Sequence, residues 1–540
     1  TMAETETKEK PRSASGFLGT VEKIGNKLPD PFWLFVILAA IVAVTSWLGH
    51  LVGMTAEDPK TGETIEVESL LTTENISRMV TDAVENFTSF PPLGVILAVM
   101  LGVAVAEQSG LLSALVRAMV TKVSAKMLTF VVALAGVTGS VASDAIYVIL
   151  IPLGAMAFHA VGRSPIVGAM VAFAASSAGF NASLILNITD LLLAGISTPA
   201  AQFVDPEYEV SPLANIFFVI PSAVVLSLII TAVTEFLMVK KARELVDHDH
   251  INYEEVSFSK AAGGAGANSE EDEEYDFTDD EEAMRIKPNE QRGLIASGIA
   301  LLLFLAAFFA LLFIPGSPLA SQGDSFMESP LISAIAVPIA LAFLVCGIVY
   351  GLAAGTVKSF ADVPEFMAKG IETLVPMLVL FFAVAQFLAW FEWSNLGVWT
   401  AIKGSELLQH WSLPPLVMFA ALVAMVALLN LFITSGSAQW ALMAPVIVPM
   451  MMYVGVSPEV SQMLFRIGDS PTNIITPMSP YFALALTFLQ RYYKHAGVGT
   501  LMSLALPYSL CMLVGWFIFF VIWYLIGLPL GPGAPMHFPA

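Results

Sequence analysis

The stretch TSGSAQWALMAP, residues 434–445, places small polar residues, a glycine and a glutamine in the middle of a long apolar run. Non-helical backbone at the depth of a membrane is tolerated only where it is buried in protein or lines a cavity, because lipid cannot hydrogen-bond to it. We therefore interpret this stretch as the tip of a helical hairpin that enters a membrane and turns back. This interpretation decides the expected fold.

The composition places the whole chain in a membrane. Of its 540 residues, 56% are hydrophobic and only 13% are charged, whereas a soluble protein carries about 25% charged residues. Apolar runs long enough to span a bilayer as helices recur between residues 31 and 526. The chain has no Walker, HExxH or nucleophile-elbow motif, so the sequence predicts neither an enzyme nor an ATP-driven pump. No nucleic-acid partner is expected.

The distribution of Lys and Arg predicts the orientation. Five of these residues lie in the polar segment 1–30, and others flank residues 240–291, so both segments are expected in the cytoplasm. Residues 244–290 contain 16 acidic and 3 basic residues, a composition typical of a disordered linker. We favour a solvated spacer over a regulatory segment. The acid-rich loops at 55–91 and 201–210 are expected outside.

This orientation requires two apolar segments, residues 127–158 and 413–456, to enter and leave the membrane on the same side. The fold class is therefore an all-α polytopic membrane protein with about nine transmembrane helices and two re-entrant hairpins. The predicted spans are residues 31–51, 92–107, 164–200, 211–238, 293–314, 330–354, 373–391, 461–490 and 501–526.

Four pairs of stretches repeat in the same order along the chain. They are AEQSGLL (106–112) with FEWSNLG (391–397), TGSVASDAIYVILIP (138–152) with SGSAQWALMAPVIVP (435–449), GRSPIVGAM (162–170) with GVSPEVSQM (455–463), and SSAGFNAS (176–183) with DSPTNIIT (469–476). The predicted topology puts Glu107 at the inner face and Glu392 at the outer face, so the repeat is inverted.

The repeat divides the chain into parts. A first membrane repeat covers residues 31–239, a linking span and loop cover 292–328, a second repeat covers 329–530, and a C-terminal tail covers 531–540. Inverted repeats with helices broken at corresponding positions are typical of secondary transporters, whose binding site lies at the breaks. Helix N-termini freed at such breaks suit a carboxylate, and freed carbonyl and hydroxyl oxygens suit a small cation.

Polar residues gather at these breaks, and several interpretations stay open. Ser177, Asn181, Asn430, Ser437 and Asn473 form either a binding site or contacts between helices. Ser140 lies at the tip of the first hairpin. Asp144, which follows this tip, either caps the returning helix or binds an ion.

Three larger side chains have two interpretations each. Arg466 forms an ion pair with Asp469 on the same helical face, or it anchors a substrate carboxylate. Asp190 is either an acid satisfied by water near the outer interface or a desolvated acid that exchanges a proton. Trp440 is either a packing residue or an aromatic wall for a ring-bearing substrate.

The segments SSAGFNASLILNITDLLLAG, NLFITSGSAQWALMAPVIVPMM and FRIGDSPTNIITPMSPYF resemble the AbgT family of p-aminobenzoyl-glutamate transporters. The similarity covers residues 30–240 and 290–526. It implies a homodimeric carrier of the bacterial inner membrane, with a scaffold domain and a moving domain that holds the hairpins. It further implies uptake of p-aminobenzoyl-glutamate or export of sulfonamide-type antimetabolites.

The resemblance also implies functional positions. These are Asp190, Asn430, Ser437, Trp440, Pro458, Arg466, Asp469 and Pro477. The driving force would come from a proton, carried by Asp190 or Asp469, or from Na⁺ held near Ser140, Asp144 and Asn181; no other cofactor is expected. The alternatives are a Na⁺-coupled carrier of dicarboxylates or citrate and, with less support, an ion channel.

Overall fold

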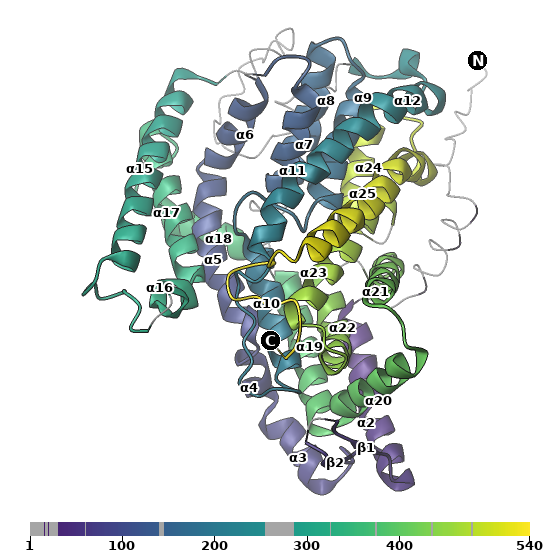
Figure 1. Cartoon of the computed structure of the whole chain (residues 1–540). Helices are drawn as coiled ribbons and strands as arrows, with labels where there is room; N and C mark the ends of the chain where they lie inside the picture. Colours follow the sequence, from purple (N-terminus) through teal and green to yellow (C-terminus); the bar gives the residue numbers. More distant parts are fainter. Residues whose placement is uncertain are drawn as a thin grey trace, which may run out of the picture.

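A computed structural model of the chain describes residues 31–539 except 60, 122, 140–144, 254–285, 324–325, 373–374, 434–435 and 477–478, together with Gly16, Thr20 and Lys27. Helices make up 74% of the chain (Figure 1), so the prediction of a helical protein is confirmed. The term all-α is wrong in one detail. Strands β1 (Thr55–Glu57) and β2 (Thr64–Glu66) form an antiparallel pair inside a predicted loop.

The helices of the first half break near the predicted positions. They are α2 (Pro31–Val52), α3 (Thr73–Thr81), α4 (Ala83–Thr88), α5 (Pro91–Gln108), α6 (Leu111–Thr121), α7 (Leu128–Thr138), α8 (Ala145–Ala160), α9 (Pro165–Phe173), the π-helical turn η2 (Ala174–Ala178), α10 (Ile188–Ala201), α11 (Ile216–Val233), η3 (Thr234–Met238), α12 (Val239–Leu245) and η4 (His248–His250). The pair α7–α8 occupies the predicted hairpin, and the interruption after η2 occupies the predicted break.

The second half repeats this pattern. Its helices are α15 (Pro288–Phe313), η6 (Phe326–Glu328), α16 (Pro330–Ser333), α17 (Ala336–Ala354), α18 (Asp362–Glu372), α19 (Val375–Trp393), α20 (Leu396–Trp411), α21 (Pro415–Asn430), α22 (Gly436–Tyr453), α23 (Pro458–Asp469), the 3₁₀ turn η7 (Pro471–Ile475), α24 (Pro480–Tyr492) and α25 (Val498–Ile526). The ends of the segment predicted as a linker, residues 240–291, include parts of α12 and α15, and its residues 254–285 lie outside the described residues.

Within the described part of the chain, five helices are long and apolar enough to cross a membrane. They are Phe32–Val52, Ile216–Leu245, Pro288–Phe313, Ala336–Ala354 and Val498–Ile526. Helices α5 and α6 together meet the same criteria, but they are bent by 63° at their junction. Shorter apolar helices, among them α7, α9 and α21, accompany them. One candidate span is therefore a bent pair of helices, and the shorter helices are not long enough to count as spans on their own.

The matched stretches around residues 109 and 394 fold alike. Each helix ends at a serine whose hydroxyl accepts the N–H two residues further on, at 3.5 Å for Ser109 and 3.3 Å for Ser394. The next residue is left-handed in both copies, with φ of 92° at Gly110 and 60° at Asn395. Glycine and asparagine are the residues that best tolerate this conformation. The two copies thus share a local structure as well as sequence.

Each helix pair packs closely on the broken helix that follows it. A Cβ added to Gly168 of α9 would lie 2.2 Å from the carbonyl oxygen of Gly154 in α8. A Cβ added to Gly468 of α23 would lie 2.8 Å from the carbonyl oxygen of Val423 in α21. Small residues allow such close approach of two helix backbones in membranes. They fix α8 to α9 and α21 to α23.

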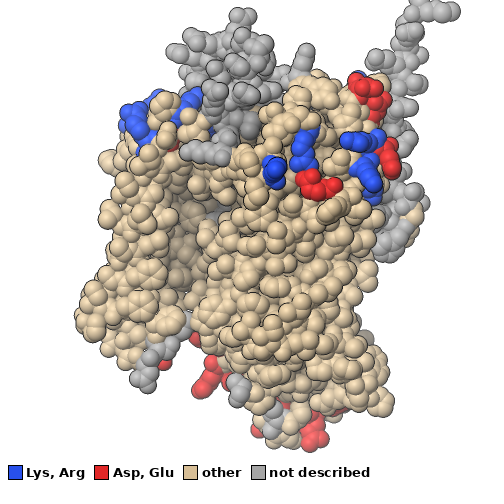
Figure 2. Space-filling view, turned by 45° about the horizontal axis from the view of Figure 1, so that its top comes forward, with Lys and Arg blue, Asp and Glu red and all other residues tan. Residues whose placement is uncertain are grey.

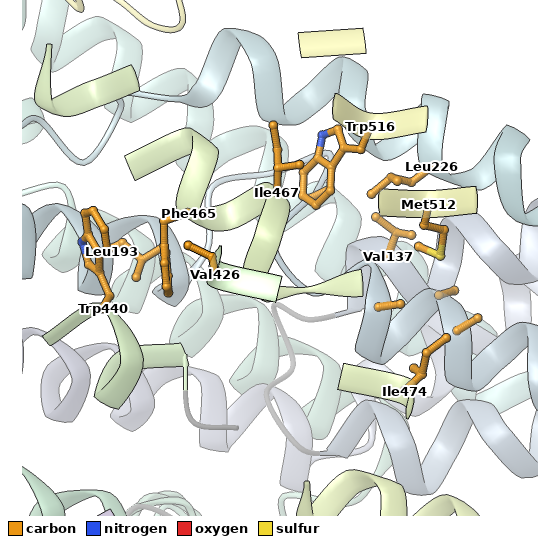
Figure 3. Packing of buried hydrophobic residues seen from close by; sticks show 14 of the residues in the cluster. Val137, Leu193, Leu226, Val426, Trp440, Phe465, Ile467, Ile474, Met512 and Trp516 are labelled. Atoms are coloured by element: carbon orange, nitrogen blue, oxygen red, sulfur yellow. The ribbon is translucent and has the colours of Figure 1, made fainter. Parts of the chain in front are cut away.

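The helices form two regions (Figure 1). Helices α15, α17 and α5 pack side by side at one edge, and α2 packs on α19. In the other region α10 packs on α22, α21 on α23, and α25 on η7. Figure 3 shows the core of this region, where Val137 of α7, Leu226 of α11 and Met512 of α25 lie around Ile474 of η7.

Charged residues mark the two ends of the molecule. Figure 2 shows Lys and Arg gathered at one end, whereas the opposite end shows only Asp and Glu. The basic end carries Lys240 and Arg243 of α12 and Lys287 at the start of α15, and the acidic end carries Glu57 and Glu66 of the β-hairpin. This asymmetry is the one that the positive-inside rule associates with a membrane protein.

Candidate functional site

The two broken segments meet in the interior. Turns η2 and η7 contact each other. The side-chain amide of Asn473 donates to the carbonyl oxygen of Ser177 at 3.1 Å, and the Ser470 hydroxyl donates to the carbonyl oxygen of Ala178 at 2.7 Å. In return, the backbone N–H of Asn181 donates to the Ser470 hydroxyl at 3.2 Å. The carbonyl groups freed at one break are thus satisfied by side chains from the other.

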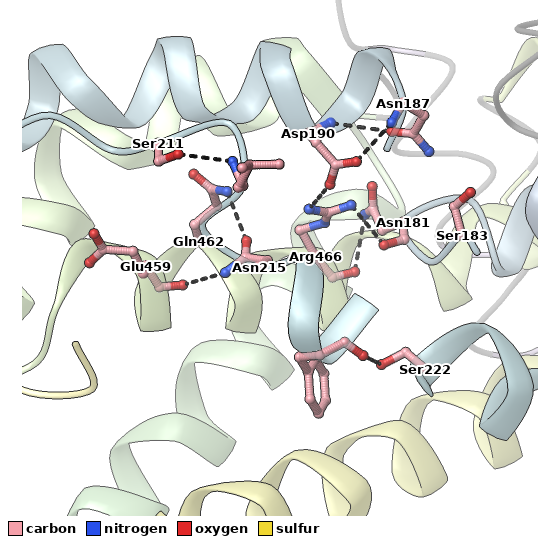
Figure 4. A network of polar contacts seen from close by, with 12 residues as sticks. Asn181, Ser183, Asn187, Asp190, Ser211, Asn215, Ser222, Glu459, Gln462 and Arg466 are labelled. Atoms are coloured by element: carbon pink, nitrogen blue, oxygen red, sulfur yellow. Dashed lines mark hydrogen bonds and ion pairs between the residues drawn. The ribbon is translucent and has the colours of Figure 1, made fainter. Parts of the chain in front are cut away.

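Arg466 is fully buried between these segments, with no exposed surface. Its Nη1 lies 2.6 Å from Oδ1 of Asp190, and its Nη2 donates to the carbonyl oxygen of Asn181 at 2.9 Å (Figure 4). The predicted ion pair with Asp469 is therefore wrong for this conformation. Although Asp469 lies on the same helix, its carboxylate faces Asn181 and Gly436, whereas the arginine reaches across to α10.

Asp190 is held by a second set of contacts. It is the third residue of α10, and its Oδ2 accepts the backbone N–H of Asn187 at 2.9 Å, while Asn187 accepts the N–H of Asp190 at 3.3 Å. This reciprocal pair is a capping box. The residue is only 2% exposed, so the interpretation of an acid satisfied by water at the interface is wrong. Both of its oxygens have protein partners.

Asp469 lies where the second break meets α22. Its Oδ2 accepts the side-chain amide of Asn181 at 3.1 Å, and a Cβ added to Gly436 would lie 2.9 Å from the same oxygen. The N-terminus of α22, with its partial positive charge, therefore lies against this carboxylate. Asn430 joins the group, since its amide donates to Thr472 and to Asn473, both at 2.8 Å.

Trp440 is a packing residue in this conformation. It has no exposed surface, and its ring stacks on Phe465 with centroids 4.6 Å apart, beside Leu193 (Figure 3). Its indole N–H donates to the Ser197 hydroxyl at 2.9 Å. A substrate ring could replace Phe465 or Leu193 against the indole only after α10, α22 and α23 separate.

A chain of hydrogen bonds that sequence reasoning missed continues from Trp440. The Ser197 hydroxyl donates to Gln462 at 2.7 Å, and the Gln462 amide donates to Asn215 at 2.8 Å. Asn215 in turn donates to the backbone carbonyl of Glu459 at 3.1 Å (Figure 4). Residues 459, 462 and 466 follow helical spacing, so their polar character in an apolar stretch was a signal for one buried polar face of α23.

The remaining predicted residues are placed as follows. Pro458 is the first residue of α23, behind the N-cap Ser457, which accepts the N–H of Val460. Ser437 is buried in the first turn of α22. The carbonyl oxygen of Ser177 is bonded as described above. Ser140, Asp144 and Pro477 lie outside the described residues, so the predicted Na⁺ site can be followed only at Asn181. The Asn181 amide nitrogen points to Asp469 and the Arg466 carbonyl.

A cavity of about 230 Å³ lies beside this network. Ile196 and Pro199 of α10 and Pro445 of α22 line it on one side. Ala389 and Glu392 of α19 line it on the other. The cavity therefore separates the helices that hold Ser197 and Trp440 from the helix that packs on α2.

Two broken helices thus meet around a charged, hydrogen-bonded centre, an arrangement typical of membrane transporters. The chain belongs to the AbgT putative transporter family, whose model matches residues 16–259 and 265–538. It is embedded in a membrane, as this family is.

Three relatives agree with this assignment. The p-aminobenzoyl-glutamate transport protein of Escherichia coli K12 is 36% identical over 96% of this chain and 97% of its own length. The crystal structure of the Alcanivorax borkumensis YdaH transporter, described as having an unusual topology, matches with a TM-score of 0.81 and 39% identity, over 93% of this chain and all of that one. Neisseria gonorrhoeae MtrF, described as illuminating a class of antimetabolite efflux pumps, matches with a TM-score of 0.83 and 39% identity, over 96% and 100%. These relatives are transporters and not enzymes.

Proposed function

We propose that this chain is a secondary active transporter of p-aminobenzoyl-glutamate or of a related aromatic carboxylate, including sulfonamide-type antimetabolites. The names of its relatives support the substrate class. The single observation that carries the proposal is the buried Arg466, which lies between the two breaks and is bonded to Asp190 of α10 and to the Asn181 carbonyl at the first break. A planar guanidinium is the group best shaped to hold a carboxylate.

In this proposal Asp190 is bonded to Arg466 at the position where a substrate carboxylate would bind. A carboxylate of the substrate would replace Asp190 at Nη1 of Arg466, and its ring would enter beside Trp440 as α10 moves away from α23. The freed Asp190 would remain hydrogen-bonded to Asn187 through the capping box, which limits the cost of losing its ion pair. Exchange of one buried partner for another avoids leaving the arginine unpaired.

The same proposal includes the number and orientation of the membrane spans. Nine spans and two re-entrant hairpins, α7–α8 and α21–α22, would form repeats of opposite orientation over residues 31–239 and 329–530. Segment 1–30 and the linker 240–291 would lie in the cytoplasm of a bacterial cell, below the inner membrane. The charge asymmetry of the surface supports this orientation (Figure 2).

Movement would follow the two regions of the fold. The body that moves would contain both helix pairs with α9, α10, α23 and α24, because these elements contact one another. The scaffold would contain α2, α5, α15 and α17 to α19, and it would form the homodimer. A proton gradient or a Na⁺ gradient would supply the driving force, with Ser140, Asp144 and Asn181 as the candidate Na⁺ ligands.

The experiment is transport by the purified full chain in proteoliposomes. Labelled p-aminobenzoyl-glutamate should exchange in counterflow, whereas labelled succinate should not. Imposing a pH gradient and a Na⁺ gradient separately, in each direction, then identifies the coupling ion and the direction of net transport. Exchange of succinate alone would support the alternative, a Na⁺-coupled dicarboxylate or citrate carrier. Currents that exceed carrier rates would identify a channel instead.

A further inference from the structure

Glu459 is a buried carboxylate that the proposed substrate site does not use. It is the second residue of α23 and is only 3% exposed. No Lys, Arg or His within the described ranges forms an ion pair with it. In Figure 4 its carboxylate points away from Gln462 and Arg466, which lie further along the same helix. An unpaired buried carboxylate is costly, so a proton or another cation must neutralise it when it is enclosed.

Two side chains are hydrogen-bonded to this carboxylate, Tyr208 and Ser457. The phenol of Tyr208 donates to Glu459, with its oxygen 2.7 Å from Oε2 and 2.9 Å from Oε1. Burial, together with the carboxylate of Glu459, raises the pKa of Tyr208 well above its usual value, so the phenol stays protonated and acts as the donor. A neutral donor stabilises a carboxylate but leaves its charge in place.

Only Tyr208 and its cover separate the Glu459 carboxylate from an exposed loop. Tyr208 belongs to the loop between α10 and α11, in which the neighbouring Glu207 and Glu209 are exposed. The ring of Phe538 covers Tyr208 edge-on, with centroids 5.9 Å apart. The C-terminal segment is held there by the N–H of Phe538, which donates to the carbonyl oxygen of Gly455 at 2.9 Å. If Phe538 and Tyr208 moved away, the Glu459 carboxylate would be exposed to water.

Among the residues that the structure describes, no Lys or Arg acts on Glu459. The loop contributes Tyr208 and Asp205. The negative charge of Asp205 helps to raise the pKa of the Tyr208 phenol and does not act on the Glu459 carboxylate. Helices α10 and α11 contribute the neutral Ser197 and Asn215 network. The C-terminal segment contributes His537, whose backbone pairs with Val456, three residues before the carboxylate.

The site is also tied to the substrate site. Asn215 holds the backbone of Glu459 and the side chain of Gln462, which in turn holds Ser197 and, through it, Trp440. Gln462 lies one helical turn from Arg466 on α23. Glu459 is therefore linked to Trp440 by a continuous set of buried hydrogen bonds, and it lies on the same helix as Arg466.

We propose that Glu459 is a proton-binding residue of the transport cycle, closed by Tyr208 and the C-terminal segment when protonated and opened to water when it releases the proton. This inference rests on the proposed function as a transporter. It differs from the candidates Asp190 and Asp469, because Asp190 is neutralised by Arg466 and Asp469 is hydrogen-bonded to Asn181 and lies against a helix N-terminus.

The test compares Glu459→Gln with Glu207→Gln, which removes the same charge from the adjoining exposed loop. Each full-length variant is placed in proteoliposomes with labelled p-aminobenzoyl-glutamate. Glu459→Gln should still exchange substrate in counterflow but should lose accumulation driven by a pH gradient, with a final inside-to-outside ratio of about one. Glu207→Gln should behave as the unmodified chain. If Glu459→Gln still accumulated substrate fully in a pH gradient, the proposal would be wrong. It would also be wrong if the unmodified chain accumulated substrate only in a Na⁺ gradient.

A second variant decides the matter if Glu459→Gln does not fold. Tyr208→Phe keeps the carboxylate and its hydrogen bond with Ser457 but removes the phenol donor, so the ionised form is less stable and the pH midpoint of transport should rise by about one unit. An unchanged midpoint would contradict the proposal. Absence of any substrate exchange by the unmodified chain would instead contradict the proposed transport function, which keeps the two failures distinct.

Discussion

At the scale of single residues, the ion pair of Arg466 and Asp190 dominates the buried site. Both side chains are removed from water, and each is the other's charge partner at 2.6 Å. Removing one member of such a pair costs more than removing both, because the survivor is left as an uncompensated buried charge. The pair therefore has two measurable roles, one in stability and one in transport.

We expect Arg466→Ala to abolish transport and to destabilise the protein by about 3–5 kcal/mol, because Asp190 remains buried without its partner. The double variant Arg466→Ala with Asp190→Asn should recover most of this stability but no transport. Thermal unfolding in detergent and counterflow in liposomes measure the two effects. As a control, Arg78→Ala breaks an exposed pair with Asp82 and should cost less than about 1 kcal/mol. Equal stability of the single and double Arg466 variants would contradict this account.

Two substitutions of Trp440 distinguish the contribution of its ring packing from that of its hydrogen bond. Trp440→Phe keeps a ring against Phe465 but loses the N–H donated to Ser197, so its stability should fall by about 1 kcal/mol. Trp440→Ala also loses the ring and should cost about 3–5 kcal/mol. Substrate exchange should survive the first change and not the second. Equal damage by the two substitutions, measured by thermal unfolding and counterflow, would show that the hydrogen bond rather than the ring is essential.

At the scale of elements, close helix contacts decide which helices move together. Gly154 and Gly168 let α8 and α9 approach until their backbones touch. Gly298 of α15 offers a contrast, since a Cβ added there meets nothing within 4 Å. The same chemical change therefore has opposite consequences in the two helices.

We expect Gly168→Ala to destabilise the protein by about 1–3 kcal/mol, because the backbone of α8 must shift to admit the methyl group. Gly298→Ala should be neutral or stabilising by up to about 1 kcal/mol, because alanine is the better helix former. Thermal unfolding of the two variants in detergent gives the comparison. A neutral Gly168→Ala would mean that α8 is not fixed to α9.

At the scale of the whole molecule, the cavity between α10 and α19 marks the boundary across which the proposed movement occurs. Ile196 and Ala389 line it from the two sides. A pair inside the proposed scaffold provides the comparison, because the sulfur of Cys346 in α17 lies 3.8 Å from the carbonyl oxygen of Ser297 in α15. A reducible crosslinker can be tested on each pair.

We expect a crosslink between Ile196→Cys and Ala389→Cys, made after Cys346 and Cys511 are replaced, to stop counterflow, and reduction to restore it. The crosslink between Ser297→Cys and the native Cys346 should leave counterflow unchanged, because both residues would stay within the scaffold. The measurement is labelled substrate exchange before and after reduction. If the first crosslink left transport intact, α10 would not move against α19.

The sequence by itself determined the membrane class, the helix pairs, both breaks and the family. These features depend on local composition. Apolar runs, prolines and polar interruptions act within one or two helical turns, as at residues 176–183 and 469–476. The approximate helix boundaries follow from them.

Only the tertiary structure decided which side chain pairs with which. Helical spacing favoured Asp469 as the partner of Arg466, but the packing of α10 brought Asp190 closer, although the two lie 276 positions apart in the chain. The same packing joined Trp440 to Ser197 and enclosed Glu459 beneath Tyr208. Spacing along a helix fixes only the face on which a side chain lies, whereas its partner depends on which helix the whole fold places opposite that face.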